Sequence, residues 1–489
     1  RTPPAAPSIT SVLDDVAPQI GVVANGGTTD DVLPVISGTA EAGATVTVYN
    51  NGILLGQVVA DGSGAWSLPV SAAFGGGAHV LTATATDPSG NLGPVSASYT
   101  VIVDTGTPVA PVITSVTDDV GTRQGNVAPG TVTDDTLPAI GGTAPINATV
   151  SVYDNGLLLG TAQADGSGVW SFVPSSPLTG TSHLFTAIAT NGAGISGPVS
   201  NSYAVTLDTS VVTTPQIVSV MDNVPMIVGG VSSGGLTNDL TPSISGTALP
   251  NVQVSIFNNG VLLTTVSADG SGAWNYTPTL LEGAQSITVS AANAAGNVSA
   301  ASAPFTFTID ATAPLAPVVN PSNGTTLTGT AEANAVIAID IGNNGSVDAQ
   351  VQANGSGAWS YTFAGNPGNA TAVSVTASDA AGNVSPPASI TIDTVPPPPP
   401  ALISIADNQA PITGLVTAGI TDDTTPTLSG TAEGLATVTI YDNGSAIGTA
   451  TADALGFWTF TPGSALAPGA HTITLMATDQ AGNSGTISG

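Results

Sequence analysis

The chain repeats itself, and this internal repetition constrains its fold more than any other feature of the sequence. Each of its five Trp residues ends a matching hexapeptide, of which "DGSGAW" is one form; they are Trp66, Trp170, Trp274, Trp359 and Trp458. An Asp precedes four of these Trp residues by 35 positions: Asp31, Asp135, Asp239 and Asp423. Constant spacing over this length indicates one domain type copied along the chain.

A closing Asp ends each of the first four repeats, and the intervals between these residues are 104, 102 and 83; they are Asp104, Asp208, Asp310 and Asp393. The predicted domains are therefore residues 1–104, 105–208, 209–310, 311–393 and 394–489. The fourth lacks a segment of about 20 residues that carries an acidic pair in the others. The fifth is expected to stop before its last strand, so both ends look cut from a longer array.

Each repeat has the residue pattern of β-strands. Residues 44–59, "ATVTVYNNGILLGQVV", alternate apolar and polar side chains, break at Asn50-Asn51-Gly52 and resume, which predicts a β-hairpin. Residues 79–87 and 96–104 alternate in the same way. Several short strands with one buried Trp in about 100 residues are typical of an immunoglobulin-like sandwich. The predicted fold is all-β, a tandem array of five immunoglobulin-like β-sandwich domains forming an extended rod.

The charge of the chain excludes several classes of partner. It has 32 Asp and Glu residues against two Lys or Arg, a net charge of -30. Nucleic acid and anionic membranes bind through basic residues, so we expect neither as a partner. Hydrophobic residues make up 42% of the chain, enough for packed cores despite the charge. The chain has no Cys, so disulfides and Cys-based zinc sites are excluded.

The combined motifs resemble a known family. Residues 421–460, "TDDTTPTLSGTAEGLATVTIYDNGSAIGTATADALGFWTF", and 471–485, "HTITLMATDQAGNSG", resemble the bacterial Ig-like repeats of giant type I-secreted adhesins. That family includes biofilm-associated proteins and large non-fimbrial adhesins. The resemblance implies β-sandwich repeats in long extracellular stalks on the bacterial cell surface, and in several members calcium binds at or near the domain junctions.

The acidic residues gather in pairs, for which the sequence offers almost no positive partner. Carboxylate and amide oxygens without nearby cations are the ligands that Ca²⁺ takes, so we predict calcium as the cofactor. The candidate ligands in paired positions are Asp14, Asp15, Asp30, Asp31, Asp118, Asp119, Asp134, Asp135, Asp222, Asp239, Asp407, Asp422 and Asp423. Asn223 and Asn238 replace Asp in the third repeat, which lowers the charge of that site and predicts weaker binding. Solvated acidic loops that only aid solubility are the alternative.

The topology of a sandwich predicts where these residues meet. A closing Asp should lie near the acidic pairs of its own repeat, and the loop after strand six of the next repeat should face it. The candidate ligands of this second group are Asp104, Asn191, Asp208, Asn293, Asp310, Asp379, Asp393 and Asp479. Calcium bridging two repeats would stiffen a rod of about 200 Å. The junction near Asp393 lacks an acidic pair but carries the run "PPPPPA", and the sequence leaves its stiffness open.

The sequence favours a structural role over catalysis. His79, His183 and His471 recur at one repeat position before a strand, which indicates a structural role and no enzyme. The predicted function is a calcium-stiffened extracellular stalk that supports adhesion or biofilm formation, whose partners are neighbouring repeats of the same chain. A glycan- or protein-binding module, or a subunit that assembles with copies of itself into filaments, is the alternative.

Overall fold

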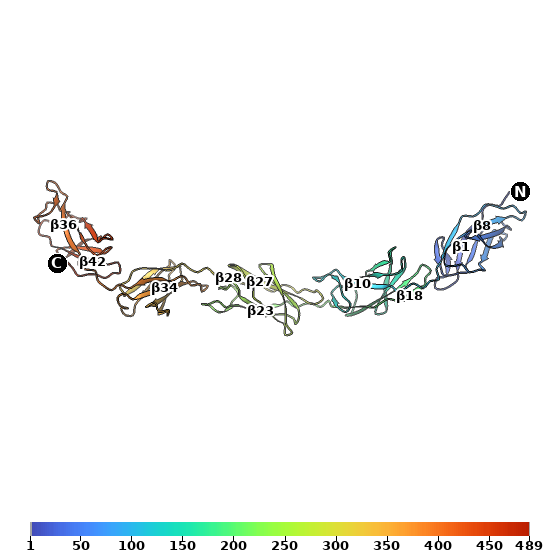
Figure 1. Ribbon diagram of the computed structural model, residues 1–489, viewed down its shortest axis with the longest axis horizontal. Helices are drawn as coiled ribbons and strands as arrows, with labels where there is room; N and C mark the ends of the chain where they lie inside the picture. The colour runs from blue at the N-terminus through green and yellow to red at the C-terminus, as the bar shows by residue number, and fades with distance from the viewer. Residues whose placement is uncertain (1, 489) are drawn as a thin grey trace.

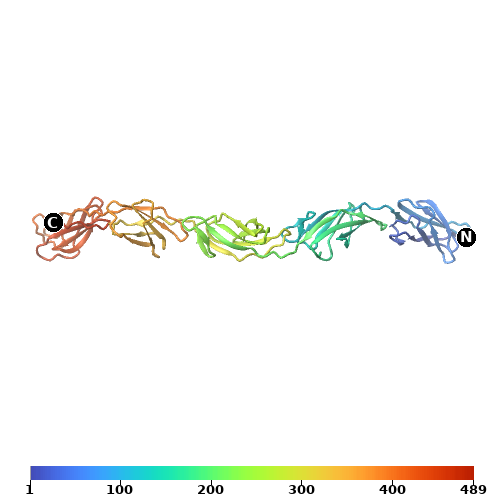
Figure 2. The ribbon, with the colours of Figure 1, turned by 90° about the horizontal axis from the view of Figure 1, so that it is seen from below.

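The computed structural model describes residues 2–488, and every regular element in this range is a β-strand. Five β-sandwiches follow one another end to end in a row that is bowed in one view and nearly straight in the other, with the two termini at opposite ends (Figures 1 and 2). The predicted all-β array of tandem sandwiches is therefore confirmed. The described residues include no helix of the length and apolarity needed to cross a membrane.

The strands of the first sandwich are β1 (Ser8–Asp14), β2 (Gly21–Val23), β3 (Gly27–Thr29), β4 (Val35–Thr39), β5 (Thr45–Asn50), β6 (Ile53–Val59), β7 (Ala65–Pro69), β8 (Gly77–Thr86) and β9 (Tyr99–Val103). Those of the second are β10 (Val112–Asp118), β11 (Gly125–Asn126), β12 (Val132–Thr133), β13 (Ala139–Thr143), β14 (Thr149–Asp154), β15 (Leu157–Gln163), β16 (Val169–Phe172), β17 (Ser182–Thr190), β18 (Ser196–Val199) and β19 (Tyr203–Leu207).

The third sandwich contains β20 (Gln216–Asp222), β21 (Gly229–Val231), β22 (Gly235–Thr237), β23 (Ser243–Thr247), β24 (Gln253–Asn258), β25 (Val261–Ser267), β26 (Ala273–Tyr276), β27 (Gly283–Ala292) and β28 (Phe305–Ile309). The fourth contains β29 (Val318–Val319), β30 (Thr326–Thr330), β31 (Val336–Ile341), β32 (Ala349–Gln352), β33 (Ala358–Thr362), β34 (Ala372–Ser378) and β35 (Ala388–Thr391). The fifth contains β36 (Ala401–Asp407), β37 (Gly414–Leu415), β38 (Thr427–Thr431), β39 (Thr437–Asp442), β40 (Ser445–Thr451), β41 (Phe457–Phe460) and β42 (Ile473–Thr478).

The first sandwich gives the pattern for the others. One sheet has the order β2-β1-β4-β7 and the other the order β3-β9-β8-β5-β6. Between β2 and β3 the chain crosses from one sheet to the other, where β3 pairs in parallel with β9. The hairpin predicted from the sequence joins β5 to β6 through Asn51 and Gly52, whose φ angles are 50° and 79°. Positive φ at both turn residues suits Asn-Gly and matches the twist of the two strands.

The fourth and fifth sandwiches depart from this pattern. In the fourth, the sheet β29-β30-β33 has three strands, and the crossing segment with its acidic pair is missing. In the fifth, the sheet β40-β39-β42 also has three strands: among residues 2–488, Ser484, Gly485 and Ser488 bond to the later part of β42, and no strand pairs with its first residues. A groove of about 560 Å³, lined in part by Ile405, Leu428 and Ile473, lies where the other sandwiches have their last strand.

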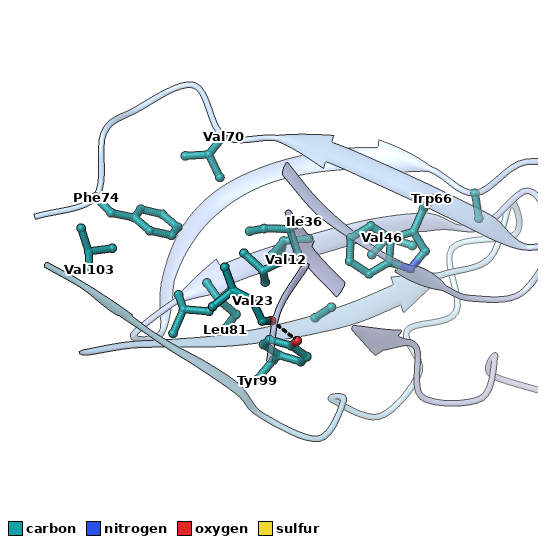
Figure 3. Close-up of a cluster of buried hydrophobic side chains, with 14 residues drawn as sticks. Val12, Val23, Ile36, Val46, Trp66, Val70, Phe74, Leu81, Tyr99 and Val103 are labelled. Atoms are coloured by element: carbon teal, nitrogen blue, oxygen red, sulfur yellow. Dashed lines mark hydrogen bonds between the residues drawn. The ribbon is translucent and has the colours of Figure 1, made fainter. Parts of the chain in front are cut away.

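A Trp anchors each core. Trp66 packs between the sheets with Val12, Ile36 and Val46 (Figure 3), and all five Trp side chains are buried. The indole N–H groups of these five residues have no hydrogen-bond partner, so their contribution comes from packing alone. A glycine on the neighbouring strand makes room for each ring, as Gly246 does for Trp274.

Because Gly246 lies so close to its neighbours, adding a single methyl group there should strongly destabilise the third sandwich. A Cβ added at Gly246 would overlap the carbonyl oxygen of Gln216 and the ring of Trp274. We expect Gly246→Ala to destabilise the third sandwich by about 3 kcal/mol, the upper range for overpacking a core. Amide hydrogen exchange in β23 and β26 should then be roughly a hundredfold faster. Gly270→Ala, at an exposed turn with open space around it, is the matched control and should leave exchange unchanged.

The open groove of the fifth sandwich predicts that an added strand will stabilise it. In the second sandwich Val205 and Tyr203 of β19 stand opposite His183 and Phe185 of β17. Appending the sequence of residues 202–208 after residue 489 places equivalent side chains opposite His471 and Ile473.

We expect the extension to raise the Tm of the fifth sandwich by roughly 10 °C, the shift that about 2 kcal/mol produces in a domain of this size. Differential scanning calorimetry measures it. A control extension with one extra residue before Ser202 reverses which side chains face the core, and an equal gain from it would contradict the expected register.

Candidate functional site at the repeat junctions

The acidic loops of four repeats are held by one recurring set of hydrogen bonds. In the first repeat the Thr29 hydroxyl donates to Asp14 Oδ2 at 2.5 Å, and the Val16 N–H donates to Asp14 Oδ1 at 2.9 Å. The same Thr hydroxyl accepts a hydrogen bond from the Asp31 N–H. The corresponding Thr–Asp pairs are Thr133–Asp118, Thr237–Asp222 and Thr421–Asp407. Both oxygens of each of these buried Asp residues therefore already have a donor within their own loop.

The second Asp of each loop differs between repeats. Asp31 and Asp135 are buried, and Oδ1 of each accepts a backbone N–H, whereas Oδ2 of each has no hydrogen-bond partner. In the third and fifth repeats this oxygen accepts a backbone N–H, from Asn223 to Asp239 at 3.1 Å and from Asn408 to Asp423 at 2.9 Å. The first two repeats thus carry a buried carboxylate oxygen that lacks a donor.

The neighbouring acids make these two loops strongly negative. Burial raises the pKa of Asp30, and the nearby charges of Asp14 and Asp31 raise it further. Burial and the charge of Asp118 raise the pKa of Asp134 in the same way. Burial likewise raises the pKa of Asp135. In the fifth repeat, by contrast, the N–H groups of Asn408 and Thr425 lower the pKa of Asp423. A cation would be favoured most at the first two loops.

Each closing Asp lies beside the acidic loop of its own repeat. The Asp104 N–H donates to the Thr29 carbonyl, and Asp208 and Asp310 make the same bond to Thr133 and Thr237, each at 2.9 Å. In the fourth repeat the Asp393 N–H donates to the Ser322 carbonyl instead. The closing Asp is therefore the point where the acidic end of one sandwich meets the linker to the next.

The next repeat contacts this point through the loop after its long strand. Asn191 Nδ2 donates to Asp104 Oδ2 at 2.9 Å, and Asn293 Nδ2 donates to Asp208 Oδ2 at 3.0 Å. At the last two junctions, Asp379 and Asp479 replace these Asn residues. There Asn383 and Asn483 donate to the backbone carbonyls of Asp310 and Asp393, both at 2.7 Å. The structure thus brings a closing Asp together with a predicted loop residue at the first two junctions, whereas at the last two the contact comes from Asn383 and Asn483, which were not predicted from the sequence.

The predicted ligands nevertheless do not form a ready-made carboxylate cage. No three His, Asp or Glu side chains within residues 2–488 are arranged to hold a metal ion. Asp15, Asp119 and Asp422 are exposed to solvent. The Asp379 and Asp479 carboxylates accept hydrogen bonds from Asn383 and Asn483 of their own loops. A calcium ion here would need amide, carbonyl or water oxygens as well, which is within its usual chemistry.

Sequence reasoning missed three kinds of junction residue. The Thr that organises each acidic loop stands two positions before the second Asp, in "TTDD", "VTDD", "LTND" and "ITDD". The Asn that bonds the linker ends the recurring tripeptide "AGN" at Asn297, Asn383 and Asn483. Arg123 was visible as one of only two basic residues besides His. All three signals recur or stand out in the sequence, but only the fold shows what they contact.

The three His residues occupy a structural position at the start of a strand. The side chain of His79 contacts Asn50, whereas His183 and His471 pair with Asp154 and Asp442, both at 2.7 Å. In the third repeat Gln285 takes the place of His and bonds to Asn258. The second ring nitrogen of His471 donates to the Ala467 carbonyl at 2.7 Å. Since both nitrogens of this ring face acceptors, His471 is best satisfied when doubly protonated.

This pairing predicts a pH dependence for the fifth sandwich. The hydrogen bonds to Asp442 and Ala467 raise the pKa of His471 above its usual value of 6.5. A raised pKa in the folded state means that the stabilisation is complete below pH 6.5 and is lost as the pH rises above it. The Tm of this sandwich should therefore fall as the pH rises from about 6 to about 8.5. The double variant His471→Gln/Asp442→Asn, which copies the Gln285–Asn258 pair, should remove this dependence; an unchanged slope would assign it to other groups.

Comparisons with known proteins agree with the repeat organisation. The family described as "Bacterial Ig-like domain" matches residues 8–105, 109–209, 219–311 and 401–488, and the family described as "Bacterial Ig domain" matches residues 313–393. No curated protein matches the chain.

Two of the solved structures that match the chain come from a large adhesion protein and a biofilm-associated protein. One is a tetra-tandem repeat in the extending region of a large adhesion protein, with 19% identity, 80% of this chain and 100% of that chain covered, and a TM-score of 0.25. The other is the BSP domain of a biofilm-associated protein, with 11% identity, coverage of 80% and 97%, and a TM-score of 0.16.

Proposed function

Because the chain belongs to the bacterial Ig-like domain family, we propose that it is part of the extracellular stalk of a large bacterial adhesin. Repeats of this family are typically structural or adhesive rather than catalytic. The stalk holds an adhesive region away from the cell surface, in support of cell adhesion or biofilm formation. Calcium at the junctions stiffens it.

The end-to-end arrangement of the sandwiches supports a spacer role. Five sandwiches lie in a line, and each meets the next only through its end loops (Figure 2). Length in such an array grows with every repeat, while the faces of the sandwiches stay free. A compact binding protein would instead bury faces between its domains.

The unpaired carboxylate oxygens at the first two junctions are the observation that carries the calcium proposal. Asp31 Oδ2 and Asp135 Oδ2 are buried without a donor, beside Asp30 and Asp134, whose pKa values burial and neighbouring charges raise. Calcium would neutralise this charge and take oxygen ligands from both sides of a junction. The next repeat is close enough to contribute, since Gly192 lies against Thr28 and Gly296 lies near Asp134.

Small-angle X-ray scattering of the whole chain, with calcium and then with excess chelator, tests this proposal. We expect the maximum dimension to shrink on chelation, because like charges repel and the junctions loosen. The variant Asp30→Asn/Asp31→Asn should lose part of the calcium response, since it removes the ligands of one junction. Asp61→Asn is the matched control, because Asp61 lies in an exposed turn that Ser63 and Ala65 satisfy.

A scattering profile that is identical with calcium and with chelator would remove calcium from the proposal. The stalk would then owe its stiffness to the direct hydrogen bonds across the junctions. A response equally reduced by Asp61→Asn would show that the total charge matters rather than the junction sites.

A further inference from the structure

One position in the acidic loop touches the next repeat at three successive junctions, and three different residues occupy it. Gln19, Arg123 and Ile227 each stand five residues after the first Asp of their loop. Each lies against a glycine of the following repeat. A Cβ added at Gly194, Gly296 or Gly382 would lie 2.8 Å from Gln19 Cγ, 3.2 Å from Arg123 Cβ and 3.2 Å from Ile227 Cγ1, respectively. The junctions therefore differ at a shared contact.

Arg123 alone among these three side chains forms a hydrogen bond with the next repeat. Its Nη1 donates to the Ala294 carbonyl at 2.7 Å, and the neighbouring Thr122 hydroxyl donates to the Gly296 carbonyl at 3.0 Å. Within residues 2–488, the side chains of Gln19 and Ile227 make no hydrogen bond across their junctions. The second junction thus has a connection from the acidic loop as well as the bonds of Asn293 and Asn297 to Asp208.

Arg123 also places a positive charge at the second junction, where its guanidinium bonds to a backbone carbonyl and, among residues 2–488, forms no ion pair with a carboxylate. It is the single Arg or Lys of residues 2–488. Gly296 lies close to the backbone of Arg123 and to Asp134: a Cβ there would be 3.2 Å from the Arg123 backbone nitrogen and 3.5 Å from Asp134 Oδ1. That oxygen is buried without a hydrogen-bond partner. A guanidinium stays charged at any physiological pH and needs no free ion in solution.

We propose that Arg123, through its hydrogen bond to the Ala294 carbonyl, holds the second junction, between the second and third sandwiches, without calcium. The first junction has Gln19 in its place and depends on calcium, whereas the second keeps its geometry when calcium is removed. This inference rests on the proposed calcium stiffening, because it assigns that dependence to one junction and exempts another. The array then bends at particular joints when calcium falls, rather than along its whole length.

Electron spin resonance distance measurements on the whole chain can test each junction separately. The chain has no Cys, so two introduced Cys residues carry the only spin labels. The pair Leu157→Cys and Gly270→Cys spans the second junction, and Ile53→Cys and Gly166→Cys spans the first. Ile53 and Leu157 are 74% and 73% exposed, and both glycines have open space around them. The two pairs occupy equivalent positions and serve as controls for each other.

In calcium, both pairs should give narrow distance distributions. In excess chelator, the distance distribution across the first junction should broaden, while the distribution across the second stays narrow. Arg123→Gln, which copies the residue of the first junction, should raise the population of bent second junctions in chelator by roughly fivefold, the effect of losing one ordinary hydrogen bond. Gln19→Arg should have the opposite effect, so that the distance distribution across the first junction stays narrow in chelator.

Two different results separate the possible failures. A second junction that broadens in chelator as much as the first, or that Arg123→Gln leaves unchanged, overturns the role of Arg123. A first junction that stays narrow in chelator without any substitution overturns the calcium proposal instead. Hydrogen exchange at β1, β10 and β20 in each variant shows whether the sandwiches on both sides of each junction remain folded, so a broad distribution from misfolding is recognised.

Discussion

The hydrogen bond between Thr29 and Asp14, repeated in four of the five sandwiches, is the interaction on which the acidic ends of this array depend. A buried carboxylate is costly unless donors surround it, and here a hydroxyl and a backbone N–H supply them. The Thr29 hydroxyl also accepts a hydrogen bond from the Asp31 N–H, and the Thr29 carbonyl accepts one from the N–H of the closing Asp104. One residue therefore ties the crossing segment, the acidic pair and the start of the linker into a single rigid end. Without it, the remaining carboxylates would have no fixed place to face the next repeat.

This arrangement divides the acidic residues into two groups with different physical roles. Asp14 and its counterparts have donors on both oxygens, so they hold the loop in shape. Asp31 and Asp135 keep one buried oxygen without a donor, and the acids beside them raise the local negative potential. In the third and fifth repeats, an Asn N–H reaches the equivalent oxygen. Replacing one Asp by Asn removes a repelling charge, and the Asn N–H then donates to the buried carboxylate oxygen. A loop of this kind has less need of a cation.

The sequence was sufficient for the fold, and it located the junctions but predicted only some of their contacts. Trp spacing, strand alternation and the Asn-Gly turn depend on local rules that repeat five times, so five sandwiches followed from them. The pairing of Asp104 with Asn191 also followed, since topology alone places both at one junction. The roles of Thr29 and Arg123 did not follow, because each depends on which side chain faces a particular carbonyl or carboxylate. Such details rest on distances of an ångström or two, which no residue pattern encodes. The calcium ligands stay a prediction for the same reason.

Charge also explains why single residues can set the properties of a joint in this chain. In a protein with many basic residues, one Arg would change little, because other cations would already neutralise the acids. Along residues 2–488 Arg123 is the single Lys or Arg, and its guanidinium bonds to the Ala294 carbonyl at a junction where carboxylates gather. A direct hydrogen bond and a bound metal ion can hold the same joint, yet only the metal ion depends on its concentration in the medium. We therefore expect the choice between Gln, Arg and Ile at one loop position to make neighbouring joints of otherwise similar repeats respond differently to the same solution.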